Sequence, residues 1–219
     1  MANIRLQDLT ATIAGTSRYN GGKWDTVHVE TLLVTDEPLP NDMNWYVPAG
    51  VSIPPEALAM FNATGLSMFP TLEANLLNGT EDIRDQAQQN NLPEVMSDAA
   101  KLMMRSVMKK TPLIPIPDAP TTYLLSYDYK LYPRADVPNA FEFTVRLPFD
   151  GLRIHPQGGR VQVSVLSPVG ARIDEAATLG RDENGQEISE LVVPLQNANR
   201  FAVTFGYQLD PDFIIRYVY

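Results

Sequence analysis

Hydrophobic and polar residues alternate through most of the second half of the chain. Segments 123–131, 141–147, 161–165, 201–207 and 213–219 carry an aromatic or branched apolar residue at almost every second position. Successive side chains of a β-strand point to opposite faces, so this pattern predicts a half-buried strand in each segment. A shift of one residue would expose the aromatic residues to water, and the register of each strand is therefore strongly specified.

Turn residues separate these segments. Gly158-Gly159 and the stretch from Asp182 to Gly185 interrupt the alternation. Asn184-Gly185 is the best hairpin candidate, because both residues tolerate the positive φ of a type I′ turn. Apolar residues show no helical spacing from residue 121 to residue 219. Many short strands separated by such turns are typical of an antiparallel β-sandwich, including the jelly roll.

The first half of the chain mixes strands with helices. Alternation from Asp25 to Val34 predicts a strand, and residues 4–13 predict a second one with imperfect alternation. The strongest helical pattern runs from Pro93 to Lys110, where apolar residues form a wide stripe at helical spacing. Acidic residues lie early in this segment and basic residues late, as the helix dipole favours. A shorter helix is expected from Thr80 to Asn90.

Prolines mark the boundary between the two halves. Residues 111–120 hold prolines at 112, 115, 117 and 120, which predicts an extended, semi-rigid connector. We therefore predict a mainly β chain, α+β overall. Residues 1–219 would form one antiparallel β-sandwich or jelly-roll-like domain, with a helical insertion at about 54–110 and this connector at 111–120. The alternative is a mixed α/β domain at 1–110 followed by a β-sandwich at 121–219.

Composition narrows the possible partners. The chain has 219 residues, with 17 Lys and Arg against 26 Asp and Glu, which gives a net charge of -9. Such a negative surface repels phosphate backbones, so we do not expect nucleic acid as a partner. Cysteine is absent, which excludes disulfides and thiolate metal sites. No apolar run reaches the ~20 residues of a membrane helix. The first residues lack the features of a secretory signal, so we expect synthesis in the cytoplasm.

Motifs of catalysis and cofactor binding are missing from the sequence. His28-Val29-Glu30 matches the H-x-E of zinc deaminases, but that signature also needs a P-C-x-x-C segment, which a chain without cysteine lacks. No G-x-S-x-G elbow and no glycine-rich phosphate loop occurs. The loop from Asp182 to Glu187 is acidic, but Gly185 stands at the wrong position for an EF-hand. We therefore predict no enzyme activity, no cofactor, and no catalytic or metal-ligating residue.

Apolar side chains indicate subunit contacts instead. The strongest predicted helix is rich in methionine, whose flexible thioether suits adaptable contact surfaces. The aromatic face of segment 123–131 suits a core or a subunit contact. The apolar segment 214–219 must be buried in its own sheet or against a neighbouring subunit. The candidate interface residues are Met96, Met103, Met104, Met108, Tyr127, Tyr129, Ile214, Tyr217 and Tyr219.

These observations favour a structural, assembly-forming protein that contacts copies of itself and other structural proteins. A cysteine-free chain without a signal segment resembles components of phage or virus particles, which are made in the cytoplasm and later meet an oxidising exterior. The resemblance implies a homo-oligomer or lattice within a virion, as a capsid, decoration or tail protein. One alternative is a carbohydrate-binding β-sandwich module that uses aromatics such as Trp24 and Trp45. A weaker alternative is a hydrolase that uses Asp and Glu side chains.

Overall fold

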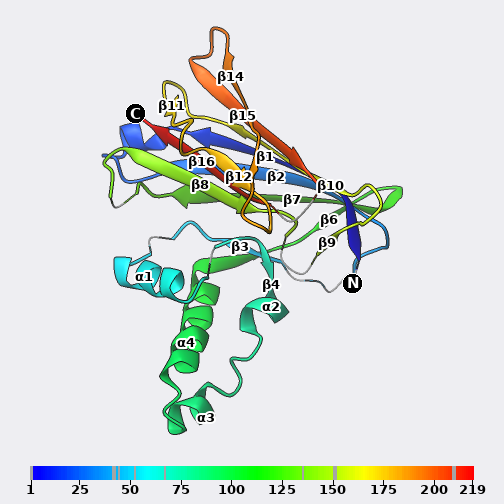
Figure 1. Cartoon of the computed structure of the whole chain (residues 1–219), viewed down its shortest axis with the longest axis vertical. Helices are drawn as coiled ribbons and strands as arrows, with labels where there is room; N and C mark the ends of the chain where they lie inside the picture. The colour runs from blue at the N-terminus through cyan, green and yellow to red at the C-terminus, as the bar shows by residue number, and fades with distance from the viewer. Residues whose placement is uncertain are drawn as a thin grey trace.

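The chain folds into a sandwich of a large and a small β-sheet, with helices to one side (Figure 1). The predicted mainly β, sandwich-like fold with a helical insertion is confirmed. This is a computed structural model, and it describes residues 2–40, 43, 45–51, 53–66, 68–134, 136–149, 152–208 and 211–219.

The large sheet has β1 at its centre. Its strands run in the order β14–β15–β10–β1–β2–β7–β6, and β9 also pairs with β1. β1 is antiparallel to β2 and parallel to β9 and β10, while the other pairs of this sheet are antiparallel. The strands are β1 (Asn3–Ala14), β2 (Asp25–Thr35), β6 (Ile114–Ile116), β7 (Ala119–Leu131), β9 (Arg153–Ile154), β10 (Arg160–Leu166), β14 (Leu191–Leu195) and β15 (Arg200–Tyr207).

The small sheet covers one face of the large sheet and is built around β16. This strand pairs with β8 along one edge and with β11 and β12 along the other, and β12 pairs with β13. All of these pairs are antiparallel. The strands are β8 (Ala140–Arg146), β11 (Arg172–Ile173), β12 (Leu179–Arg181), β13 (Glu187–Ile188) and β16 (Asp212–Val218).

The main core lies between the two sheets. Inward residues of β2 and β7 form rows of paired side chains, as where Val29 stands opposite Tyr127. Phe205 of the large sheet meets Phe213 of the small sheet, with 4.8 Å between ring centroids. Each fully buried side chain of this kind contributes about 1.5–3 kcal/mol to stability. The largest are Trp45, Tyr217, Phe141, Phe143, Phe149, Phe205 and Phe213.

Residues 45–111 form a helical unit that extends from the sandwich (Figure 1). Its strands β3 (Trp45–Pro48), β4 (Thr71–Leu72) and β5 (Met108–Thr111) make a short antiparallel sheet. Its helices fall within the predicted insertion at 54–110, and they pack around a second, smaller core that includes Phe61, Leu76 and Met104. The helices are α1 (Pro55–Ala63), α2 (Glu73–Leu77), α3 (Ile83–Gln88) and α4 (Leu92–Val107).

The predicted end of the strongest helix was wrong. The helix ends at Val107 rather than Lys110, because Met108–Thr111 pairs with Trp45–Pro48 as β5. Within the predicted extended connector at 111–120, Ile114–Ile116 pairs with β7 as an edge strand, although residues 115 and 117 are prolines. An edge strand tolerates proline because a missing N–H on its free side breaks no ladder hydrogen bond.

Two further differences concern local backbone geometry. The short helix expected from Thr80 to Asn90 covers only Ile83–Gln88. At the hairpin tip, Gly185 has a φ of 76° but Asn184 does not have a positive φ, so the predicted type I′ turn is wrong. Asp182 explains the alternative turn, because its Oδ1 accepts hydrogen bonds from the backbone N–H groups of Asn184 and Gln186 at 2.9 and 2.8 Å.

Candidate functional site

Helix α4 has apolar side chains on two faces, of which one is buried. Ala100 and Met104 are 0% and 1% exposed and belong to the small core. On the other face, Leu92 is 65% exposed and Met103 is 40% exposed. We call this exposed face the α4 stripe. It consists of the exposed residues Leu92, Met96, Leu102, Met103 and Ser106 and of the half-buried residues Val95 and Ala99.

Two basic side chains, Arg105 and Lys101, fix α4 against the rest of the helical unit. Arg105 donates to the Tyr46 hydroxyl at 2.6 Å and to Glu73 Oε1 at 3.3 Å, and its guanidinium lies 3.8 Å from the Tyr46 ring centroid. Tyr46 in turn donates to Glu73 Oε1 at 2.7 Å. Nearer the start of the helix, Lys101 Nζ donates to the backbone oxygen of Asn78 and to Asp98 Oδ1 of the same helix, both at 3.0 Å. These contacts hold the buried face inward and so fix the direction in which the α4 stripe points.

The same contacts shift the ionisation of their members. Hydrogen bonds from Tyr46 and Arg105 lower the pKa of Glu73 below its ordinary value. Burial, followed by the hydrogen bond to Glu73, raises the pKa of Tyr46. Glu73 therefore stays ionised and Tyr46 stays neutral at physiological pH, which preserves the charged hydrogen bonds that anchor the helix.

Charges of opposite sign lie at the two ends of α4. The end that adjoins α3 is mainly acidic, with Arg84 as a single basic residue among the carboxylates. The end that adjoins β5 is mainly basic, although Glu73 pairs there with Arg105. The exposed acidic residues are Glu81, Asp82, Asp85 and Glu94, and the basic residues are Arg105, Lys109 and Lys110.

The predicted interface residues divide according to burial. Met96 and Met103 are 41% and 40% exposed and lie together on the α4 stripe. Tyr129, Ile214 and Tyr219 are partly exposed and lie on the sandwich. The prediction was wrong for the other four, because they fill the cores of their own chain and present almost no surface. Those four residues are Met104, Met108, Tyr127 and Tyr217.

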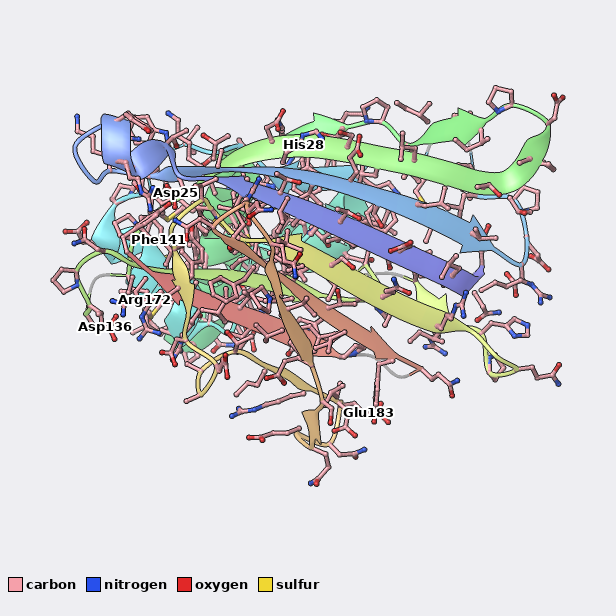
Figure 2. The ribbon with its side chains drawn as sticks, turned by 90° about the horizontal axis from the view of Figure 1, so that it is seen from above. Asp25, His28, Asp136, Phe141, Arg172 and Glu183 are labelled. Atoms are coloured by element: carbon pink, nitrogen blue, oxygen red, sulfur yellow. The ribbon has the colours of Figure 1, made fainter. Side chains whose placement is uncertain are left out.

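The buried carboxylate of Asp25 fixes the position of the end of β16. Asp25 is 0% exposed and accepts hydrogen bonds from the Ser17 backbone N–H at 2.9 Å, the Tyr217 hydroxyl at 2.7 Å and the Tyr219 hydroxyl at 2.9 Å. Figure 2 shows Asp25 next to the 3₁₀ turn η1 (Thr16–Tyr19). Burial and the neighbouring Asp25 raise the pKa of both tyrosines. The cluster therefore locks β16 to the start of β2.

His28, Glu30 and Asp128 are exposed on the outer face of the large sheet, where His28 of β2 stands opposite Asp128 of β7 (Figure 2). His28 Nδ1 is 2.7 Å from Asp128 Oδ1, and its Nε2 is 3.6 Å from Glu30 Oε1. The hydrogen bond to Asp128 raises the pKa of the imidazole above its ordinary value of 6.5. Within the part of the chain that the structure describes, no three His, Asp or Glu side chains gather as a metal site requires.

The sequence analysis missed a hollow of about 970 Å³ where β9, β10 and β15 meet. Arg160, His155 and two glutamines contribute polar groups to its lining, and Gly206 leaves open space above β15. A glycine inside an otherwise alternating strand was the available signal, since such a glycine often marks a site of close approach. The glutamines are Gln162 and Gln208.

The two tryptophans proposed for sugar stacking have different surroundings. Trp45 is 0% exposed and lies 5.4 Å from the Phe149 ring between centroids, so it belongs to the main core and cannot meet a ligand. Trp24 is partly exposed, and Lys130 Nζ lies 4.2 Å from its ring centroid. A continuous aromatic platform made by both residues is therefore excluded.

The sequence matches no model of a known protein family, and no curated protein sequence matches it. Among the helices of the described residues, none combines the length and the apolar character needed to cross a membrane.

Proposed function

We propose that this is a structural, assembly-forming protein without catalysis, of the kind that builds phage or virus particles. Its function is to join protein subunits through an apolar helix face. The observation that supports this proposal is the α4 stripe, on which Leu92, Met96 and Met103 are 65%, 41% and 40% exposed. Contiguous exposed apolar surface on a folded protein is typical of an interaction site.

The build of the helical unit supports the same function. Arg105 and Lys101 fix α4 by hydrogen bonds to the Tyr46 hydroxyl and to the Asn78 backbone oxygen, so the helix presents the stripe on a rigid support. A rigid surface loses less conformational entropy when a partner binds. Methionine side chains adapt to the shape of a partner, which suits repeated contacts that are similar without being identical.

The experiment compares the mass in solution of the wild-type protein and of two charged variants. Met103→Glu places a carboxylate within the α4 stripe, and Val169→Glu is the control because Val169 is an exposed apolar residue away from α4, at 50% exposure. We expect light scattering to give a mass above 24.3 kDa for the wild type and the control, and a lower mass for Met103→Glu. A wild-type mass of 24.3 kDa at every concentration would overturn the proposed function.

A second candidate function is carbohydrate binding in the hollow between β9, β10 and β15. Its volume of about 970 Å³ is large enough for a ligand, and amide, guanidinium and phenol groups lie around it at Gln162, Arg160 and Tyr207. Binding to a glycan array that is lost in Arg160→Ala and kept in Arg153→Ala would favour this function. Equal binding by both variants, or none by the wild type, would exclude it.

A further inference from the structure

We propose that the partner of the α4 stripe is a second copy of this chain, and that the two α4 helices pack antiparallel with Ala99 at the two-fold axis. This inference rests on the proposed function, because it names the partner of the same face. It follows from the spacing of the stripe residues, from the surface next to them and from the charges at the two ends of the helix.

The α4 stripe is symmetric about Ala99. Its other residues lie three, four and seven positions before and after this alanine. A two-fold axis at Ala99 would therefore place each stripe residue of one copy opposite a stripe residue of the other, as a self-complementary interface requires. The resulting pairs are Leu92 with Ser106, Val95 with Met103, Met96 with Leu102, and Ala99 with Ala99.

Residue sizes in the stripe suit two helices in contact. Spacings of three and four residues are those of helices that pack side by side with interlocking side chains. Ala99 at the crossing point permits the close approach of two helix axes, about 8–10 Å. Larger apolar residues lie on both sides of the crossing point, namely Val95, Met96, Leu102 and Met103. The contact therefore has a small residue at its centre and larger apolar residues around it.

A hollow between α3 and α4 adds a place for a bulky side chain of the partner. Its volume is about 410 Å³, and Ala87, Leu92 and Val95 contribute to its lining. In the antiparallel arrangement, the residue opposite Val95 is Met103 of the second copy. A flexible methionine is well suited to fill an irregular hollow of this kind.

Charge complementarity selects the antiparallel direction. The acidic end of one α4, with Asp82, Asp85 and Glu94, would lie beside the basic end of the other, with Lys109 and Lys110. A parallel arrangement would place like charges together at both ends and would align the two helix dipoles unfavourably. Since each copy carries a net charge of -9, this local attraction is needed to offset the general repulsion between copies.

Helix α4 of the helical unit is long enough to pack along the α4 of a second copy. α4 has 16 residues, which span about 24 Å, and Figure 1 shows it extending away from the sandwich. Ala57 and Phe61 of α1 and Leu76 of α2 pack in the small core with the buried face, so these helices leave the stripe uncovered.

The absence of cysteine allows a direct test. In an Ala99→Cys variant, any disulfide must join residue 99 of two copies. The bond requires Cα atoms within about 4.4–6.8 Å of each other, so it forms only if the two positions meet. Ser106→Cys is the matched control, because the antiparallel arrangement separates the two copies of residue 106 by 14 helix positions, about 21 Å.

We expect Ala99→Cys to give a disulfide-linked dimer under mild oxidation and Ser106→Cys alone to give none. A mixture of Leu92→Cys and Ser106→Cys should give the linked dimer again, since these positions face each other. Met103→Glu should weaken self-association by about tenfold or more, by removing apolar contact and burying a charge. Circular dichroism of each variant confirms that the helices are retained.

Two results would overturn the inference and are distinguishable from failure of the proposed function. The first is a mass above 24.3 kDa while the Ala99→Cys variant forms no disulfide-linked dimer, which contradicts the antiparallel pair but leaves an assembly protein. The second is equal disulfide linkage in the Ala99→Cys and Ser106→Cys variants, which contradicts the geometry in the same way. A mass of 24.3 kDa at every concentration contradicts both proposals together.

Discussion

The hydroxyl of Tyr217 donates a 2.7 Å hydrogen bond to Oδ2 of Asp25, although 192 positions separate the two residues. Both residues are 0% exposed, so the carboxylate of the first residue of β2 is matched inside the protein by a phenol near the end of β16. The hydrogen bond joins the two sheets of the sandwich at one corner. A buried carboxylate is stable there because donors surround it.

Replacement of Asp25 by alanine should strongly destabilise the fold. The Ser17 backbone N–H and the hydroxyls of Tyr217 and Tyr219 would lose their common acceptor. We expect the free energy of unfolding to fall by about 3 kcal/mol or more. Tyr217→Phe is the milder comparison, because Asp25 keeps two donors, and we expect a loss of about 1 kcal/mol. Urea unfolding of the two variants measures the difference, and equal losses would contradict the role of Asp25.

Alkaline pH should weaken the fold through its buried tyrosines. Burial, and for Tyr217 also the neighbouring Asp25, raises the pKa of Tyr127 and Tyr217 above the ordinary value of 10.0. Below pH 10 both states hold the proton and the stabilisation is complete. As pH rises above 10, the unfolded chain loses protons that the folded protein keeps, so the free energy of unfolding falls.

This loss should approach about 1.4 kcal/mol per pH unit for each such tyrosine. Urea unfolding between pH 8 and pH 11 measures the slope. In Tyr217→Phe the free energy of unfolding should fall less steeply with pH, by about 1.4 kcal/mol per pH unit, because one titrating group is removed. An unchanged slope in that variant would show that the Tyr217 hydroxyl ionises as readily in the folded protein as in the unfolded chain.

Two adjacent methionines of α4 should respond differently to truncation. Met104 is 1% exposed and fills the small core, so Met104→Ala should lower the free energy of unfolding by about 2–5 kcal/mol. Met103 is 40% exposed, and Met103→Ala should change it by less than about 0.5 kcal/mol in dilute protein. Thermal unfolding followed by the helical signal of circular dichroism compares the two, and similar effects would contradict the assignment of the two faces.

Two glycines of the sandwich give a similar contrast. A methyl group at Gly180 would lie 3.1 Å from Phe213 Cδ1 and 3.2 Å from Ile188 Cβ, so Gly180→Ala should cost about 1–3 kcal/mol. A methyl group at Gly206 meets nothing within 4 Å, and Gly206→Ala should be nearly neutral. The melting temperature should therefore fall by several degrees in the first variant only. Equal melting temperatures would indicate that the core at Gly180 yields without strain.

Alternation of residue types was sufficient to predict the inner faces of the sandwich. Val27, Val29 and Leu33 are all buried, as the pattern of Asp25–Val34 requires. The imperfect alternation of β1 has a physical origin, because its register with β2 shifts between Ile4 and Leu6. That irregularity was visible in the sequence, but the pairing that causes it was not.

Tertiary contacts decided what local patterns could not. Met103 and Met104 are chemically identical neighbours, and only the positions of α1 and α2 determine which of them is buried. Residues 108–110 follow a helical pattern, yet Trp45–Pro48 offers a strand edge, and Met108–Thr111 pairs with it instead. The hollow beside Gly206 depends on a turn at residues 155–159, far from β15 in the chain.

The parallel pairing of β1 with β10 sets an order of events while the chain is being synthesised. β2 leaves the ribosome soon after β1 and can pair with it at once. The other edge of β1 stays open until Arg160–Leu166 has been made, and β16, which completes the cover over the apolar face, follows later still. A nascent chain of this protein therefore carries an unsatisfied strand edge while residues 36–159 are being made, and we expect it to depend on chaperones that shield such surfaces.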